Sequence, residues 1–384
     1  MGETLFLDLK DFALAVAAAL LPGGLLASVS ALISAGAVLV VAPVTMMFLT
    51  WVERKGVGRF QDRYGPNRVG PFGVLQPIAD GIKMILKEDI IPDGSDRLLH
   101  NIMPVLAAAP VFLLFLVLPF GRGMVAADLN VGVLFFLCIS SMQSPMIISA
   151  GLGARSKYSV LGSMRAVVQV LSYEIPMVIV IVAVVMTAGS MSTSEIVAAQ
   201  VRDGWFVLTP WGAFGFIVFL IAATAEANRS PFDMSEAESE LVAGFHTEYS
   251  GFKFALFQMA EFLSAFASAG LAATLFLGGW QGPGFLPSWA WFGAKALGVY
   301  FVLVWFRATL PRFRIDQLLA LAWKFLFPLS LLVVVAAAAW YFMPLLPALV
   351  TNLVLLVGGY GLLSSWILSE FIRMNAPRAV PDAR

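Results

Sequence analysis

The chain has 384 residues, of which 60% are hydrophobic, and its mean hydropathy is +0.87. Its 24 basic side chains balance 24 acidic ones, and no basic patch with interleaved aromatic residues indicates nucleic-acid binding. A single cysteine, Cys138, excludes an intrachain disulfide or a thiolate cluster, and two histidines, His100 and His246, leave few candidate haem ligands. We expect a polytopic membrane protein whose redox centres, if it takes part in redox chemistry, belong to partner chains.

The first element in chain order is an apolar stretch at 12–27, broken by proline and glycine. Its flank is acidic and holds Lys10 as its only basic side chain, which argues against a cleaved signal peptide and favours an interfacial helix. Nine apolar runs follow, at 25–51, 103–119, 131–151, 167–188, 206–225, 252–277, 289–306, 318–339 and 345–368. Most approach the roughly 20 residues that span about 30 Å of hydrocarbon, and lipid permits helices there, so we predict an all-α membrane fold.

The distribution of basic residues predicts the orientation. Twenty of the 24 Lys and Arg fall on the side that holds the segment after the first span, and three fall on the other side. By the positive-inside rule, that segment is cytoplasmic, the N-terminus is outside and the C-terminus is inside.

The longest segment between spans covers residues 53–101. Residues 52–60 form an amphipathic pattern that predicts a piece lying along the membrane interface. A turn rich in Gly and Pro follows at 64–71, and 75–84 resumes a helical pattern that places Asp80 one turn from Lys83. The segment is either a simple surface loop, or a docking platform or pocket mouth for an amphipathic ligand.

Three carboxylates lie within or at the end of predicted spans: Glu174, Glu226 and Glu261. Charges in hydrocarbon are costly and usually face the bundle interior, where they mark ion or proton routes or form structural ion pairs. Arg165, which lies nine residues before Glu174, and Arg307, which closes the seventh span, are the candidate counter-charges.

Carboxylates are densest at residues 226–248, which hold Glu226, Asp233, Glu236, Glu238, Glu240 and Glu248. Crowded like charges disfavour one another's ionisation, so this stretch is a candidate proton- or cation-handling site, or else a solvated loop. Ser235 and Glu238 fit a capping box that would start a short helix. The spacing of a calcium loop is missing, and we expect no metal site.

Several long motifs closely resemble the family of the quinone-tunnel membrane subunit, the H subunit, of proton-translocating NADH–quinone oxidoreductases (respiratory complex I). The resemblance covers about residues 25–330 and is carried by residues 53–55, 61–71, 75–77, 156–162, 172–174, 229–233, 236–241, 247–251, 307–312 and 316–318. It implies an eight-helix core within 25–338, after an N-terminal segment 1–24. An additional transmembrane helix at 339–369 and a cytoplasmic tail at 370–384 lie beyond that core.

In that family the protein forms most of a narrow quinone tunnel and begins a proton or charge route. Carried over, the resemblance implies that the tunnel involves Arg54, Arg63, Arg229 and Phe232. It implies a route from Glu236, Glu238 and Glu240 through Glu226, Glu174 and Glu261, with Asp80, Arg165, Arg229 and Arg307 as charged partners. The substrate would be ubiquinone or menaquinone. FMN and Fe–S clusters would reside on partner subunits, in a bacterial inner membrane.

The resemblance has one departure that bears on the route. Some relatives carry a Glu at the position of Ser141, so that carboxylate is not an obligatory relay here, and Pro145 nearby is expected to kink the third span. Two alternatives remain open from the sequence. One is the equivalent component of a membrane-bound hydrogenase, and the other is a stand-alone cation or proton transporter, although no internal repeat supports the latter.

Overall fold

The computed structural model describes residues 8, 10–12, 14–15, 26–234 and 242–375, and these are mainly helical. An isolated bridge between Gly121 and Met124 is the only β-pairing within those ranges. The helices are α2 (Leu26–Phe60), η2 (Pro71–Gly73), α3 (Gln76–Leu86), α4 (Arg97–Leu114), α5 (Gly132–Ser141), α6 (Gln143–Gly153), α7 (Lys157–Ala188), α8 (Thr193–Asp203), η3 (Phe206–Leu208), α9 (Pro210–Glu226), η4 (Gly244–His246), α11 (Gly251–Phe276), α12 (Ser288–Thr309), α13 (Ile315–Ala320), η5 (Leu321–Leu326), α14 (Phe327–Phe342) and α15 (Leu345–Asn375). The predicted all-α class is confirmed.

Eight helical segments of the described chain are long and apolar enough to cross a membrane. The remaining predicted span, the fifth at 206–225, corresponds to α9, which has 17 residues and lies at the short end of the range for a crossing helix. The predicted interfacial helix at 12–27 falls largely on residues that are not described.

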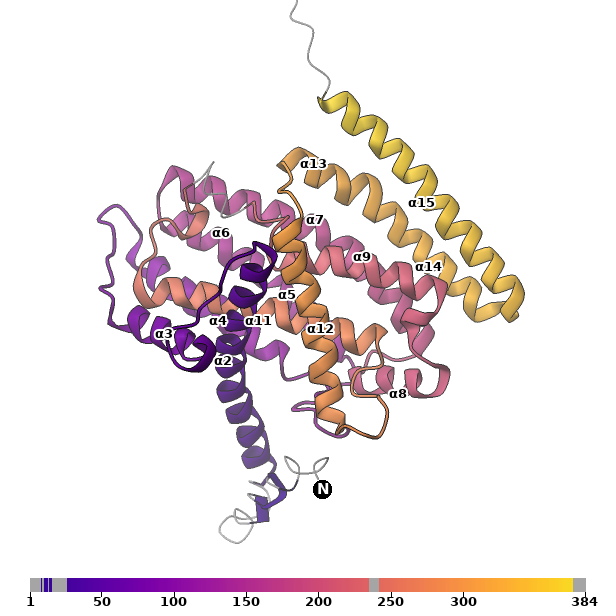
Figure 1. The fold of residues 1–384 in the computed structure, drawn as a ribbon, viewed down its shortest axis with the longest axis horizontal. Coiled ribbons are helices and arrows are strands. Elements are labelled where there is room, and N and C mark those ends of the chain that lie inside the picture. Colours follow the sequence, from indigo (N-terminus) through magenta and orange to yellow (C-terminus); the bar gives the residue numbers. More distant parts are fainter. Residues whose placement is uncertain (1–7, 9, 13, 16–25, 235–241, 376–384) are drawn as a thin grey trace, which may run out of the picture.

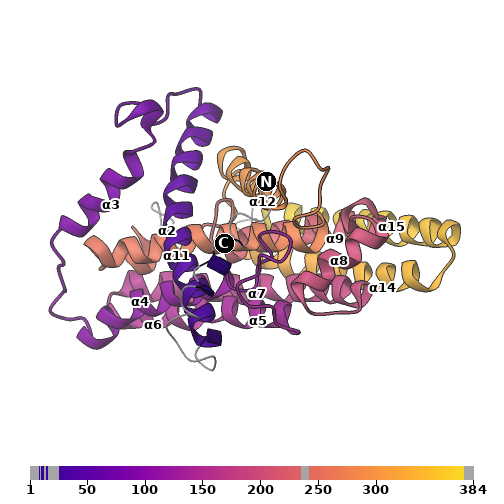
Figure 2. The same ribbon diagram turned by 90° about the horizontal axis from the view of Figure 1, so that it is seen from below.

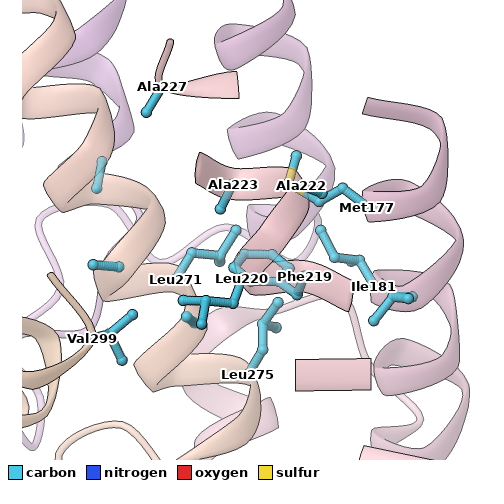
Figure 3. Close-up of a cluster of buried hydrophobic side chains, with 14 of the residues drawn as sticks. Met177, Ile181, Phe219, Leu220, Ala222, Ala223, Ala227, Leu271, Leu275 and Val299 are labelled. Atoms are coloured by element: carbon cyan, nitrogen blue, oxygen red, sulfur yellow. The ribbon is translucent and has the colours of Figure 1, made fainter. Parts of the chain in front are cut away.

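The centre of the bundle is α11. In its most hydrophobic 18-residue stretch 83% of the residues are buried, against 17% in the corresponding stretches of α2 and α15. Side chains of α7, α9 and α12 pack around it, including Ile181, Phe219 and Val299, as Figure 3 shows. Because the alternative environment in a membrane is lipid and not water, van der Waals packing of such side chains holds these helices together. This packing fixes the end of α9 and the body of α11, where the predicted carboxylates Glu226 and Glu261 lie.

The first helix differs from its prediction. Residues 52–60 do not form a separate interfacial piece, because α2 continues without a break to Phe60. No proline follows Trp51 before the chain turns at Asp62, whose φ of 53° lies in the left-handed region, and Gly56 and Gly58 remain within the helix. The end of α2 and the separate helix α3 therefore project together from one side of the bundle (Figure 2). The helical pattern predicted at 75–84 is confirmed by α3.

The third and eighth spans are irregular. The third is divided at Met142 into α5 and α6, three residues before Pro145, which confirms a break near that proline. The eighth contains the π-helix η5 between α13 and α14. Beyond it, α15 lies along α14 at the side of the bundle away from α3 (Figure 1).

Candidate functional site

Glu53 is the centre of a buried cluster of charges drawn from four parts of the fold. Its Oε2 lies 2.6 Å from Nη1 of Arg229, in the loop after α9, and accepts a 3.0 Å hydrogen bond from the hydroxyl of Tyr300 on α12. Its Oε1 is paired with Arg307, at the end of α12. Nε of Arg229 lies 3.0 Å from Oε1 of Glu261 on α11, which extends the cluster into the bundle.

The charges of this cluster balance, with two carboxylates and two guanidinium groups. Glu53 is 5% exposed and Arg229 is 4% exposed, so both have lost nearly all contact with water. Burial alone would lower the pKa of Arg229, but Glu53 and Glu261 outweigh it and raise that pKa above its usual value. Removing one member of such a cluster leaves a buried charge uncompensated.

A cleft of about 850 Å³ opens beside the cluster, between the end of α2 and the turn that follows it. Two cluster members, Glu53 and Arg307, form part of its wall, so the buried charges are in direct contact with the cleft. The other lining residues are Arg54, Val57, Arg63, Tyr64, Gly65, Pro66, Asn67, Arg68 and Gln76. The wall therefore combines several basic groups with apolar surface, which suits an amphipathic ligand that carries polar oxygens.

One edge of the cleft is held by α3. Asp80 on this helix lies 2.5 Å from Nη1 of Arg54, and it also accepts hydrogen bonds from Gln76 at 3.1 Å and Lys83 at 3.3 Å. Burial would raise the pKa of Asp80, but the hydrogen bonds from Arg54, Gln76 and Lys83 outweigh it and lower that pKa below its usual value. Asp80 therefore remains charged near neutral pH and anchors α3 to the end of α2.

A second, smaller cavity of about 30 Å³ lies deeper, between the C-terminal end of α9 and the N-terminal half of α11. Glu226 and Glu261 both line it, together with polar groups of Gln143, Asn228, His246 and Ser264. Oε2 of Glu226 is buried and has no hydrogen-bond partner among the residues of the described ranges. A polar cavity of this size can hold one or two water molecules, which would satisfy that oxygen and connect the two carboxylates.

The third intramembrane carboxylate lies close to Glu226 but belongs to α7. Glu174 accepts a hydrogen bond from the hydroxyl of Ser141, at the break between α5 and α6. The neighbouring Ser140 hydroxyl lies against Glu226, and the charge of Glu174 acts on Glu226. Arg307 pairs with Glu53 and not with Glu174, whereas Arg165 lies half-buried on α7, nine residues before Glu174.

The structure therefore brings together most of the residues singled out in the sequence. Arg54, Arg63 and Arg307 line the cleft, and Arg229 joins it to Glu261. Phe232 is buried elsewhere, between the rings of Tyr173 and Phe313 at centroid distances of 5.2 and 5.8 Å. Glu236, Glu238 and Glu240, with the capping box at Ser235, lie outside the described residues.

Several members of the site were not predicted as site residues from the sequence, among them Glu53, Tyr300, Gln143 and His246. Glu53 occurs in a charged motif just after the first apolar run. Had the first helix been predicted to continue past Trp51, Glu53 would have lain within it, and the rule that charges within spans face the interior would have identified it. The other three give no signal on their own, because a single tyrosine, glutamine or histidine in or beside a helix is common. Among the described residues, no three His, Cys, Asp or Glu side chains are grouped to hold a metal ion.

Comparison with known proteins gives consistent results. Residues 33–338 match the model of the NADH dehydrogenase family. The H subunit of NADH-quinone oxidoreductase from Dehalococcoides mccartyi strain CBDB1 is 53% identical over 288 residues, which is 75% of this chain and 80% of that protein. The corresponding H subunit from Geobacillus kaustophilus is 48% identical over 309 residues, covering 78% and 92% of the two chains. The matched region ends within α14, so α15 lies beyond it.

Proposed function

The chain belongs to the NADH dehydrogenase family, and from this premise we propose that its cleft binds the quinone headgroup and that its buried carboxylates couple quinone reduction to proton translocation. Its relatives are named as subunits of NADH-quinone oxidoreductase. The chain is accordingly a membrane subunit of that enzyme complex. The relatives' names favour this assignment over a stand-alone transporter or a component of a hydrogenase.

The observation that carries the proposal is the shared position of Glu53 and Arg307. Both line the cleft, and both belong to the buried cluster that reaches Glu261 through Arg229. A change of charge in the cleft therefore acts directly on a group inside the bundle. In surroundings of low dielectric constant such interactions are much stronger than in water.

Reduction of a quinone to a quinol consumes two electrons and two protons. The electrons would come from Fe–S clusters, and before them from FMN, on partner subunits of the hydrophilic arm. Arg54 and Arg63 would attract the partly negative oxygens of the headgroup. A headgroup that has gained electrons before protons is negatively charged and would compete with Glu53 for Arg307. The Arg307 side chain is 40% exposed and can reorient, whereas Arg229 is fixed by burial.

The route would then run inward along the carboxylates. A weakened Arg307–Glu53 pair alters the charge felt by Arg229 and hence by Glu261. Water in the small cavity would carry a proton between Glu261 and Glu226, and Ser140 and Ser141 lie between Glu226 and Glu174. We place Glu236, Glu238 and Glu240 at the cytoplasmic start of this route on the basis of sequence.

The family also bears on how the chain lies in its membrane and in the complex. The chain is a multi-pass membrane protein, and we propose that the segment 53–101 faces the cytoplasm of a bacterium and meets the hydrophilic arm. The exposed basic side chains around the cleft would contact two quinone-site subunits of that arm. Small membrane subunits would cover other faces of the bundle.

The test is a quinone-reductase assay on the assembled complex purified through a tag on this chain. Arg54→Met should raise the KM for a short-chain quinone and change inhibitor sensitivity, because Arg54 lines the cleft and holds Asp80. Unchanged quinone kinetics and inhibitor response in a fully assembled complex would refute the assignment of the cleft.

A further inference from the structure

The 3₁₀ helix η4 forms part of the wall of the Glu226–Glu261 cavity, because His246 lines it. The backbone N–H of Tyr249 donates to the carbonyl of His246 at 2.9 Å, so residues 247–249 continue directly from η4. The position of His246 therefore depends on what holds the segment 247–253. The contacts of that segment come largely from a distant part of the chain.

Four interactions fasten 247–253 to residues 87–100, which comprise the connection between α3 and α4 and the first turn of α4. Nζ of Lys253 lies 2.7 Å from Oδ2 of Asp89, and the Lys253 side chain is only 13% exposed. The hydroxyl of Ser250 accepts a 3.0 Å hydrogen bond from the N–H of Ile90 and donates a 3.4 Å bond to the carbonyl of Glu88. The ring of His100 stacks on Tyr249 with centroids 4.3 Å apart and planes at 2°.

The backbone at this junction is suited to close approach. Gly251 has a φ of 54°, and a Cβ there would lie 3.1 Å from the carbonyl oxygen of Lys87. A side chain at position 251 would be strained and would push the two segments apart. His100 is fully buried, and neither ring nitrogen has a hydrogen-bond partner within the described residues, so its contribution is the stacked ring.

The other side of η4 is held by α7. A Cβ at Gly162 would lie 2.7 Å from Cα of Gly244, and the hydroxyl of Ser159 donates to the carbonyl of Phe245 at 3.2 Å. These contacts hold η4 against α7, while the contacts with residues 87–100 hold the segment 247–253 that follows η4. The second group is connected to the cleft, because residues 87–96 begin at the end of α3, which carries Asp80.

We propose that residues 87–100 act as a clasp on residues 247–253, and that this clasp transmits movement of α3 at the cleft to His246 in the wall of the carboxylate cavity. Lys253, Ser250 and His100 are positioning residues in this mechanism, which rests on the proposed function of the cleft and of the carboxylates. When the headgroup occupies the cleft and disturbs the Arg54–Asp80 pair, α3 shifts, the clasp shifts with it, and the cavity between Glu226 and Glu261 changes shape.

The test uses the assembled complex in liposomes with four variants. Lys253→Met and Asp89→Asn break the ion pair, and the exchanged pair Lys253→Asp with Asp89→Lys restores it in reverse. Arg314→Met is the matched control, since it removes an exposed ion pair with Asp316. Two quantities are measured: amide hydrogen exchange of peptides covering 242–253, and protons translocated per NADH oxidised.

We expect both single variants to increase amide exchange in 242–253 by about threefold to tenfold and to lower the proton ratio by about twofold. The exchanged pair should recover most of both losses, and Arg314→Met should match the parent. A merely structural pair would change the amount of complex without changing the proton ratio. If Lys253→Met fails to assemble, Ser250→Ala, which removes two hydrogen bonds and no charge, is judged by the same two quantities.

Parental exchange and parental proton ratio in assembled single variants, or no recovery in the exchanged pair, would overturn the clasp. Failure of the proposed function is distinguishable from failure of the clasp. Glu226→Gln with full proton pumping would refute the carboxylate route, and amide exchange would then decide on the clasp alone because it needs no pumping.

Discussion

Replacement of Glu53 by Gln removes one charge from the cluster beside the cleft and nearly preserves the shape of the side chain. The glutamine carbonyl can still accept the hydrogen bond from Tyr300, but Arg229 and Arg307 lose their shared carboxylate. Breaking a buried ion pair from one side costs about 3–5 kcal/mol. Two features reduce this here: Arg229 keeps Glu261 at 3.0 Å, and Arg307, being 40% exposed, regains water.

We therefore expect a cost of about 2 kcal/mol, which corresponds to a roughly 30-fold slower quinone reduction if it is expressed in the rate-limiting step. The assay is NADH oxidation with a short-chain quinone by the purified complex, with acidification of liposomes followed in parallel. Glu195→Gln, which changes a carboxylate on α8, a helix that contributes no member to the cluster, is the control. An assembled Glu53→Gln complex with the parental rate and proton ratio would refute the role given to the cluster.

Three further predictions concern the route and the cleft. Glu226→Gln should lower quinone-dependent turnover at least about tenfold while the complex still assembles, as gel filtration and activity would show, because Gln cannot carry a proton. Ser141→Ala removes the hydroxyl that donates to Glu174 and should slow proton pumping about threefold, with the KM for quinone unchanged. Asp80→Asn should raise the KM for quinone about threefold, and this factor should stay constant across about pH 6–8. The pKa of Asp80 is lowered, so its pairing with Arg54 is complete above the ordinary carboxyl pKa and is lost only as the pH falls through the lowered value. A pH-dependent effect in that range would contradict this assignment.

The apolar runs were sufficient to predict the helices of the bundle, and Pro145 was sufficient to predict a break in the third span. The same patterns placed Glu174, Glu226 and Glu261 inside the bundle, because uncompensated charges are not stable in hydrocarbon. They failed at 52–60, where an amphipathic pattern was interpreted as a piece lying along the membrane interface, although α2 continues through these residues to Phe60.

The assembly of the cluster could not be predicted from sequence spacing. Glu53 meets Arg229, Tyr300 and Arg307 across separations of 176, 247 and 254 residues. Such pairings depend on which helices are neighbours, and helical periodicity carries no information about that. For the same reason the sequence identified Arg307 as a counter-charge but did not identify Glu53 as its partner. The contact of Lys253 with Asp89 likewise gave no local signal in the sequence.

The most direct test of the central claim is photolabelling of the assembled complex with a quinone that carries an azide on its headgroup. Label on this chain should fall within residues 53–68 or on Gln76 or Arg307, where the chain lines the cleft, and excess short-chain quinone should prevent it. Label confined to residues outside the cleft, or label in the cleft that excess quinone does not reduce, would contradict the claim that the headgroup reacts beside Glu53.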